Sequence, residues 1–206
     1  MSAAGAFMPP MLIFPRVKEN KELLEGAPAG AWSEFHKSGW IQVDIFTRWF
    51  RRFINYSHAS KDNPILLLLD GHISHVKNLE VIELAMEHGV EIICFPPHCT
   101  HRMQPLDVGF MKPLSHYYTE EVNVFQRTGE RVTLKNVFLL FGKAFMKAGK
   151  IDTAVNAFKK CGIFPLNPKI FSKSDFACSN TDASTLNQST PKTPQFEAEV
   201  RNYSEM

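Results

Sequence analysis

The sequence has few cysteines, little net charge and no long apolar run. Four cysteines in 206 residues are too few for a disulfide scaffold, and no N-terminal run resembles a signal peptide, so we expect a reducing, intracellular compartment. The net charge of +2 is far below the basic excess of a stand-alone DNA-reading module, so contact with nucleic acid would depend on local patches. The longest apolar run is too short for a bilayer, so we expect no membrane span.

What the sequence does contain is enough apolar material for one core. Hydrophobic residues make up 44% of the chain and aromatic residues 12%, which is sufficient for one domain of ordinary size. From about residue 172 onward the chain is rich in Ser, Thr, Asn and Pro and has few large apolar residues. We therefore expect a folded domain over residues 1–171 and a disordered tail over residues 172–206.

The central part of the sequence predicts an α/β fold. The apolar run at 65–69 predicts a strand buried on both faces, and a second strand is predicted at 90–95. Between them, apolar residues at helical spacing predict a helix within 76–89 that ends at Gly89. Because strand, helix and strand follow in quick succession, we expect the two strands to be parallel neighbours.

Further elements are expected on both sides of this unit. A strand is predicted within the N-terminal segment MLIF, and an aromatic stripe predicts an amphipathic helix within GWIQVDIFTRWFRRFINY. The segment PPHCTHRMQPLDVG is predicted to be an ordered loop, because it mixes prolines with histidines, Arg and Gln. Three helices are expected after it: one with Pro113 near its first turn, one at about 133–147, and one at 152–161 that ends at Gly162.

Two acids are expected at one edge of the predicted sheet. Asp70 directly follows the strand at 65–69, and the segment beyond the next strand carries Asp107. In a parallel sheet, ligands gather at the carboxyl ends of the strands. Two carboxylates at one place raise each other's pKa unless a divalent cation neutralises them, and such hard oxygen ligands suit Mg²⁺ or Mn²⁺. The pattern therefore indicates a metal site.

These residues also have structural interpretations. Asp70 and Gly71 can form a turn and a cap before the next helix, and Asp107 can cap its own helix. His72 and His75 lie three residues apart, so they can ligate a metal, but histidines in such loops also cap and pack.

Two further charged or metal-binding sets have simple interpretations. A zinc site can be drawn from four residues, although their spacing matches none of the usual zinc patterns and the first lies in a predicted strand: Cys94, His98, Cys99 and His101. In the aromatic helix, Asp44 is expected to be a first-turn acid that the helix dipole favours. The arginines of that helix are expected to form a solvated face rather than a phosphate contact: Arg48, Arg51 and Arg52.

Three motifs together resemble the DDE superfamily endonuclease domain of pogo/Tigger/jerky-type transposases. They are LLLLDGHISH, FPPHCTHRMQPLDVGFMKPL and FKKCGIFPLNPKIF, and they stand in the family's order at plausible distances. The resemblance runs from about residue 3 to residue 176.

The resemblance implies an RNase H-like fold in which three acids bind two divalent metals, Mg²⁺ or Mn²⁺, and cut DNA by in-line attack. By motif, Asp70 matches the second acid and Asp107 the third, with 36 residues between them. Four residues match motif positions as supporting residues: His72, His75, His101 and Gln104. DNA as partner and the nucleus as location follow from the same resemblance.

The first acid of the family has no counterpart in this sequence. In the family it lies on the first strand, whereas MSAAGAFMPP resembles the hairpin that follows the second strand. We therefore expect an incomplete, N-terminally truncated RNase H-like fold that lacks its first two strands but has additional C-terminal helices. Such a chain is expected to be catalytically inactive and to leave a sheet edge open to a homo-oligomer or a missing N-terminal segment. The alternative function is a domesticated, non-catalytic remnant that associates with DNA or protein.

Overall fold

Two parallel strands organise the central part of the chain. The computed structural model describes residues 1–72, 77–172 and 175, and in it β3 runs over Ile65–Leu69 and β4 over Val90–Cys94. The strands pair in parallel, with Ile65 opposite Val90 and Leu69 opposite Cys94. This confirms that the two strands predicted from the sequence are parallel neighbours.

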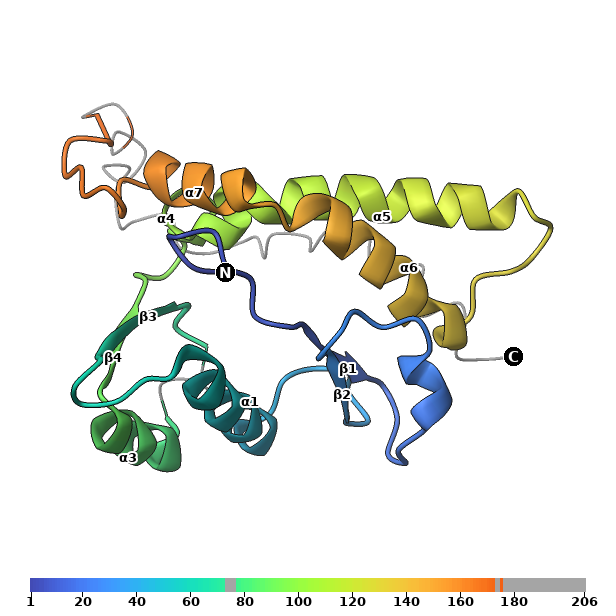
Figure 1. Ribbon diagram of the computed structural model, residues 1–206, viewed down its shortest axis with the longest axis horizontal. Helices are drawn as coiled ribbons and strands as arrows, with labels where there is room; N and C mark the ends of the chain where they lie inside the picture. The colour runs from blue at the N-terminus through green and yellow to red at the C-terminus, as the bar shows by residue number, and fades with distance from the viewer. Residues whose placement is uncertain (73–76, 173–174, 176–206) are drawn as a thin grey trace, which may run out of the picture. The chain divides into compact units, whose positions relative to one another are not determined.

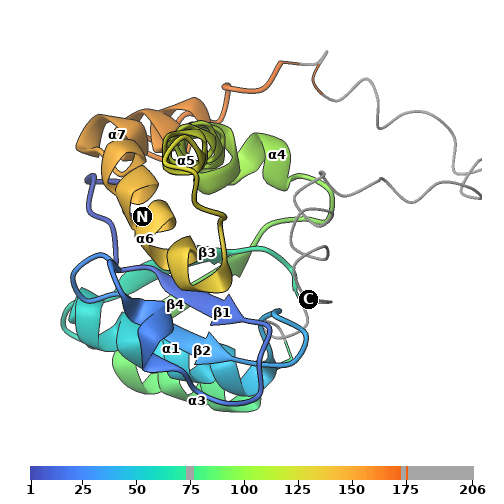
Figure 2. The same cartoon turned by 90° about the vertical axis from the view of Figure 1, so that its right-hand side faces the viewer.

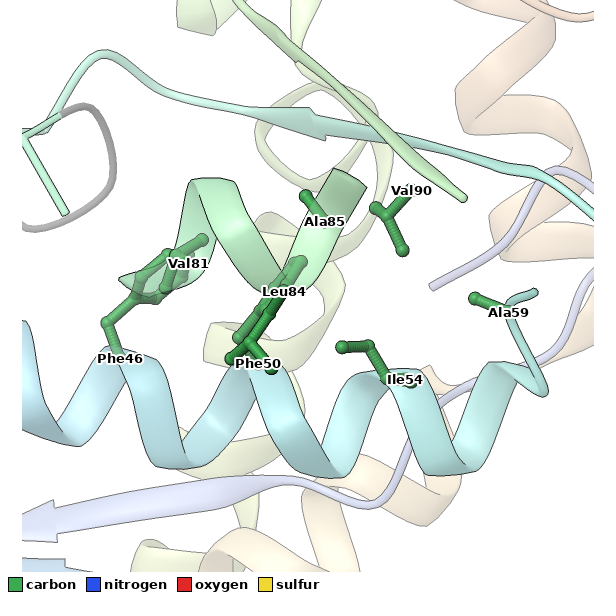
Figure 3. Close-up of a cluster of buried hydrophobic side chains, with 8 residues drawn as sticks. All are labelled: Phe46, Phe50, Ile54, Ala59, Val81, Leu84, Ala85 and Val90. Atoms are coloured by element: carbon green, nitrogen blue, oxygen red, sulfur yellow. The ribbon is translucent and has the colours of Figure 1, made fainter. Parts of the chain in front are cut away.

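One face of this strand pair packs on two helices, α1 (Val43–Ser57) and α3 (Leu79–His88). Figure 3 shows apolar side chains of α1 pointing toward those of α3. The buried cluster consists of Phe46, Phe50, Ile54, Ala59, Val81, Leu84, Ala85 and Val90. The aromatic stripe of α1 is therefore confirmed as its buried face. The end of α3 at Gly89, in the left-handed conformation (φ 67°), is also confirmed.

A second pair of parallel strands lies near the N-terminus. Strand β1 (Met11–Phe14) confirms the predicted MLIF strand, and it pairs with β2 (Trp32–Phe35). A short 3₁₀ helix, η1 (Lys21–Leu24), lies between them in sequence. The buried residues Phe14, Leu23 and Phe138 form the core of this part. Strand β2 was not predicted, since its four residues follow a Gly/Pro/Ala-rich segment and alternate too briefly to give a signal.

The C-terminal half of the described chain is helical. It contains α4 (Thr100–Met103), η2 (Leu106–Phe110, a π-helical turn), α5 (Met111–Gln126), α6 (Leu134–Ala148) and α7 (Ile151–Lys160). The three longer helices lie near the predicted positions, and Figures 1 and 2 both show α5 and α6 side by side. The prediction of a loop at PPHCTHRMQPLDVG was wrong in part, because α4 and η2 form within it. Short helical turns carry too few residues to show a periodic pattern.

Residues Met1–Asn167 form one compact unit. Most of the expected tail lies outside the described residues, so its disorder and the boundary at residue 171 stay predictions. The mixed α/β architecture is consistent with a DDE-type domain. The RNase H-like arrangement without its first two strands also stays a prediction.

The other face of β3 and β4 is exposed. Leu66 is 55% exposed and Ile93 is 53% exposed, and within the described residues β3 pairs with β4 alone. Strand β3 contains no charged residue and no proline within Ile65–Leu69. Natural edge strands are normally protected by such residues, and an unprotected apolar edge tends to pair with other chains.

We predict that Leu66→Lys reduces self-association of the protein without unfolding it, because a lysine on an edge strand opposes pairing with another strand. Sedimentation velocity over a range of concentrations should show that the wild-type chain associates. The variant should begin to associate only at a several-fold higher concentration. The matched control is Val17→Lys, which places the same charge on an apolar residue that is 82% exposed outside any strand. An equal effect of both substitutions would show that net charge, and not the edge, controls association.

Candidate active site

Asp70 lies directly after β3, at the carboxyl end of the strand. Its side chain is half-buried, and its Oδ1 accepts a hydrogen bond from the backbone N–H of His72 (3.3 Å). An Asp side chain that bonds the backbone two residues on forms an Asx-type turn. The structure therefore bears out the turn interpretation of Asp70, and a turn that holds the carboxylate in place is compatible with a ligand role.

The end of β4 lies beside this turn. The Cys94 thiol has a pKa above its ordinary value, because burial and the nearby Asp70 carboxylate both disfavour the thiolate. A Cβ atom on Gly71 would lie 3.9 Å from the carbonyl oxygen of Phe95. Asp70 is thus placed at the shared carboxyl end of β3 and β4, as the sequence predicts.

Asp107 lies in the first turn of η2, where its side chain is exposed. The helix N-cap is Pro105, and no side-chain hydrogen bond caps this end. The simple capping interpretation of Asp107 is therefore wrong. Its electrostatic neighbour is Cys161, at the C-terminal end of α7, whose pKa burial and the Asp107 carboxylate together raise to about 11.

The close approach of η2 to α7 depends on Gly109. A Cβ atom at this position would lie 2.5 Å from the Cβ of Ala157 and 3.0 Å from its Cα, so any larger residue would push the two helices apart. Gly109 stands two residues after Asp107 in the same turn. This contact therefore sets where Asp107 lies relative to α7.

The described contacts of the two acids differ, since Asp70 lies near Cys94 and Asp107 lies near Cys161. Among residues 1–72, 77–172 and 175, no three His, Cys, Asp or Glu side chains gather closely enough to hold a metal ion. The zinc interpretation is contradicted by this result, since all four of its residues are described: Cys94, His98, Cys99 and His101.

The supporting residues have different environments. His72 is exposed next to Asp70, and His101 is exposed on α4. The backbone of Gln104 joins two helical turns, because its N–H donates to the Thr100 carbonyl and its own carbonyl accepts from the Val108 N–H. His75 lies outside the described residues.

The charged residues of α1 form intramolecular contacts. Asp44 is a first-turn acid, as predicted, and it pairs with Arg48 at 3.0 Å. Arg48 also binds Glu34 of β2 at 2.7 Å. The prediction of a solvated face is confirmed, since all three arginines are exposed. The other two also have partners on the surface: Arg51 pairs with Glu80, and Arg52 stacks over the ring of Trp32.

Asn78 is a buried polar residue that the sequence reading did not single out. It is 3% exposed, and its Nδ2 donates to the Val43 carbonyl and to Thr47 Oγ1 of α1, at 3.1 and 2.9 Å. Its Oδ1 accepts from the Val81 N–H and so caps α3. The signal was present, because Asn directly before an apolar periodic run is typical of a helix start. Asn78 ties the segment after Asp70 to α1.

We predict that Asn78→Ala lowers the free energy of unfolding by about 1–3 kcal/mol, because a helix cap is lost and buried polar groups of α1 lose their partner. Urea denaturation followed by circular dichroism measures the loss. Asn78→Ser, which keeps an oxygen for the cap, should lose less. Equal stability of the Ala variant and the wild type would contradict the assigned network.

A second prediction concerns Cys161. With a pKa of about 11, only about one thiol in a thousand is ionised at pH 8, so alkylation by iodoacetamide should be slow and should accelerate up to about pH 11. Replacing the other three cysteines by Ser isolates the reaction of this thiol. Asp107→Asn should lower the pKa and speed labelling at pH 8, whereas Asp152→Asn, an exposed acid on α7, should not. If both variants were labelled at the same rate, the Asp107 carboxylate would not be a cause of the raised pKa of Cys161.

Comparisons with known proteins identify the family. The model of the DDE superfamily endonuclease family matches residues 2–158. A protein of Cochliobolus lunatus named MFS-type transporter clz9 is 29% identical over 173 residues, which cover 82% of this chain but only 19% of that protein. No helix in the described part of this chain is long and apolar enough for a membrane crossing. No solved structure matches the chain. Since the family model covers most of the sequence, the chain belongs to the DDE superfamily endonuclease family.

Proposed function

We propose that this chain is a transposase-derived nuclease domain of the pogo/Tigger/jerky type that associates with DNA in the nucleus, with Asp70 and Asp107 as its metal ligands. The observation that carries the proposal is the position of Asp70 at the shared carboxyl end of β3 and β4, within a family match that also includes Asp107. DDE nucleases act on DNA, and their acids are the groups that hold divalent metals.

The donor chemistry of the two residues fits Mg²⁺ or Mn²⁺. Both supply carboxylate oxygens, which these ions prefer, and Mg²⁺ commonly uses one or two carboxylates and keeps several waters. When bound, the ions would activate the attacking oxygen and stabilise the leaving oxygen. The chain's own contribution at Asp70 is orientation, because the His72 N–H donates a hydrogen bond to Oδ1.

We further propose that these 206 residues do not cut DNA by themselves. The sequence supplies acids at the second and third motif positions only, and no described group of three acids is present. Loss of one carboxylate from a two-metal site removes several kcal/mol of charge stabilisation in the transition state, which is about three orders of magnitude in rate. The alternative of a non-catalytic, protein-binding domain is favoured by one observation, the exposed apolar face around Leu66 and Ile93.

The test combines metal binding with strand cleavage. We predict that calorimetric titration with Mn²⁺ detects weak binding to the wild-type chain, which Asp70→Asn and Asp107→Asn each reduce at least tenfold. Asp62→Asn, which removes an exposed acid from a turn, is the control and should bind as the wild type does. In the same buffer, supercoiled plasmid should stay uncut.

The two possible contrary results test different parts of the proposal. Plasmid nicking that disappears in Asp70→Ala would overturn the proposed inactivity and would confirm a working site. Unchanged Mn²⁺ binding in both Asp variants would overturn the assignment of the metal ligands.

A further inference from the structure

The turn η2 continues directly into α5, so Asp107 shares one helical rod with the residues that follow. Phe110 and Met111, at the junction, both have right-handed helical backbone angles. The Met111 N–H donates to the Leu106 carbonyl, five residues earlier. In such a π-turn, residues five apart lie on the same side of the helix. Asp107 and Lys112 therefore lie on one side of the rod, about one turn apart.

His116 continues this row by a further turn, since it lies four residues after Lys112 in regular α-helix. Lys112 and His116, together with Pro113 and Tyr117, line an open hollow of about 320 Å³. The hollow therefore lies on the helix that carries Asp107, with a lysine at the end nearer to that acid.

Of the described charged side chains around the hollow, Lys112 is the one available to bind a ligand. Lys112 is exposed, and among the described residues no acidic side chain forms an ion pair with it. The Nε2 of His116 lies 3.4 Å from Glu120, and Lys147, which lies over the Tyr117 ring, is bound to Glu121 at 2.6 Å. Lys112 is thus the group at this hollow whose positive charge is not neutralised by a contact.

We propose that this hollow binds a backbone phosphate of the DNA strand that passes Asp107. The inference rests on the proposed function and adds to it a contact that positions the substrate. The Lys112 ammonium supplies the charge, and the Pro113 and Tyr117 side chains offer apolar surface to the sugar. Contacts of this kind fix the register of a strand without reading its sequence.

The experiment measures DNA affinity without metal, so that it does not depend on catalysis. Fluorescence anisotropy with a labelled 20-base-pair duplex, in EDTA and at salt concentrations from 50 to 200 mM, compares the wild-type chain with Lys112→Ala and Lys112→Arg. We expect a three- to tenfold loss of affinity for the Ala variant and a salt slope lower by about one unit, as for one lost phosphate contact. The Arg variant should stay near the wild type.

The matched control is Lys37→Ala, which removes an exposed lysine between β2 and α1 and should leave affinity and salt slope near the wild-type values. If Lys112→Ala binds as the wild type does, or if Lys37→Ala loses as much, the phosphate site is overturned and the proposed function still stands. If the wild-type chain binds no DNA at all, DNA association itself fails. Unchanged circular dichroism of the variants excludes unfolding as the cause of a loss.

Discussion

The parallel pairing of β3 with β4 is the constraint on which the candidate site depends. The two strands share one register, and their inner faces pack on α1 and α3 through one buried cluster. A shift of one residue would turn the apolar side chains of β3 to the opposite face, so burial fixes the register. With the register fixed, Asp70 lies at the end of β3, beside Cys94 at the end of β4 and Phe95 directly after it. The position of this acid is therefore a consequence of core packing.

The sequence predicts well those elements whose signal is contained within the element itself. The five consecutive apolar residues at Ile65–Leu69 and the helical spacing of the apolar residues of α1 are visible in the local sequence alone. Strand β2 is different, because its four residues are strand-like only beside β1, and because Glu34 is held by Arg48 from α1. The turn η2 likewise depends on the close contact of Gly109 with Ala157, almost fifty residues later. Contacts between distant segments produce no pattern in the local sequence, so elements that depend on them cannot be predicted from it.

The same distinction separates the two candidate acids. Asp70 is predictable, since a strand end defines its place and its neighbour is the adjacent strand. The surroundings of Asp107 are set by α7, which brings Cys161 next to it. Sequence spacing therefore gives the order of the two acids along the chain, but the contacts of the second follow from helix packing. The family match includes both acids.

The Asp70 carboxylate has a partner in the backbone that follows it, the His72 N–H. A carboxylate at the end of an apolar strand is costly only if it is desolvated without a partner, and this one is half-exposed and accepts a backbone N–H. The position of Asp70 therefore follows from the strand end and the turn after it.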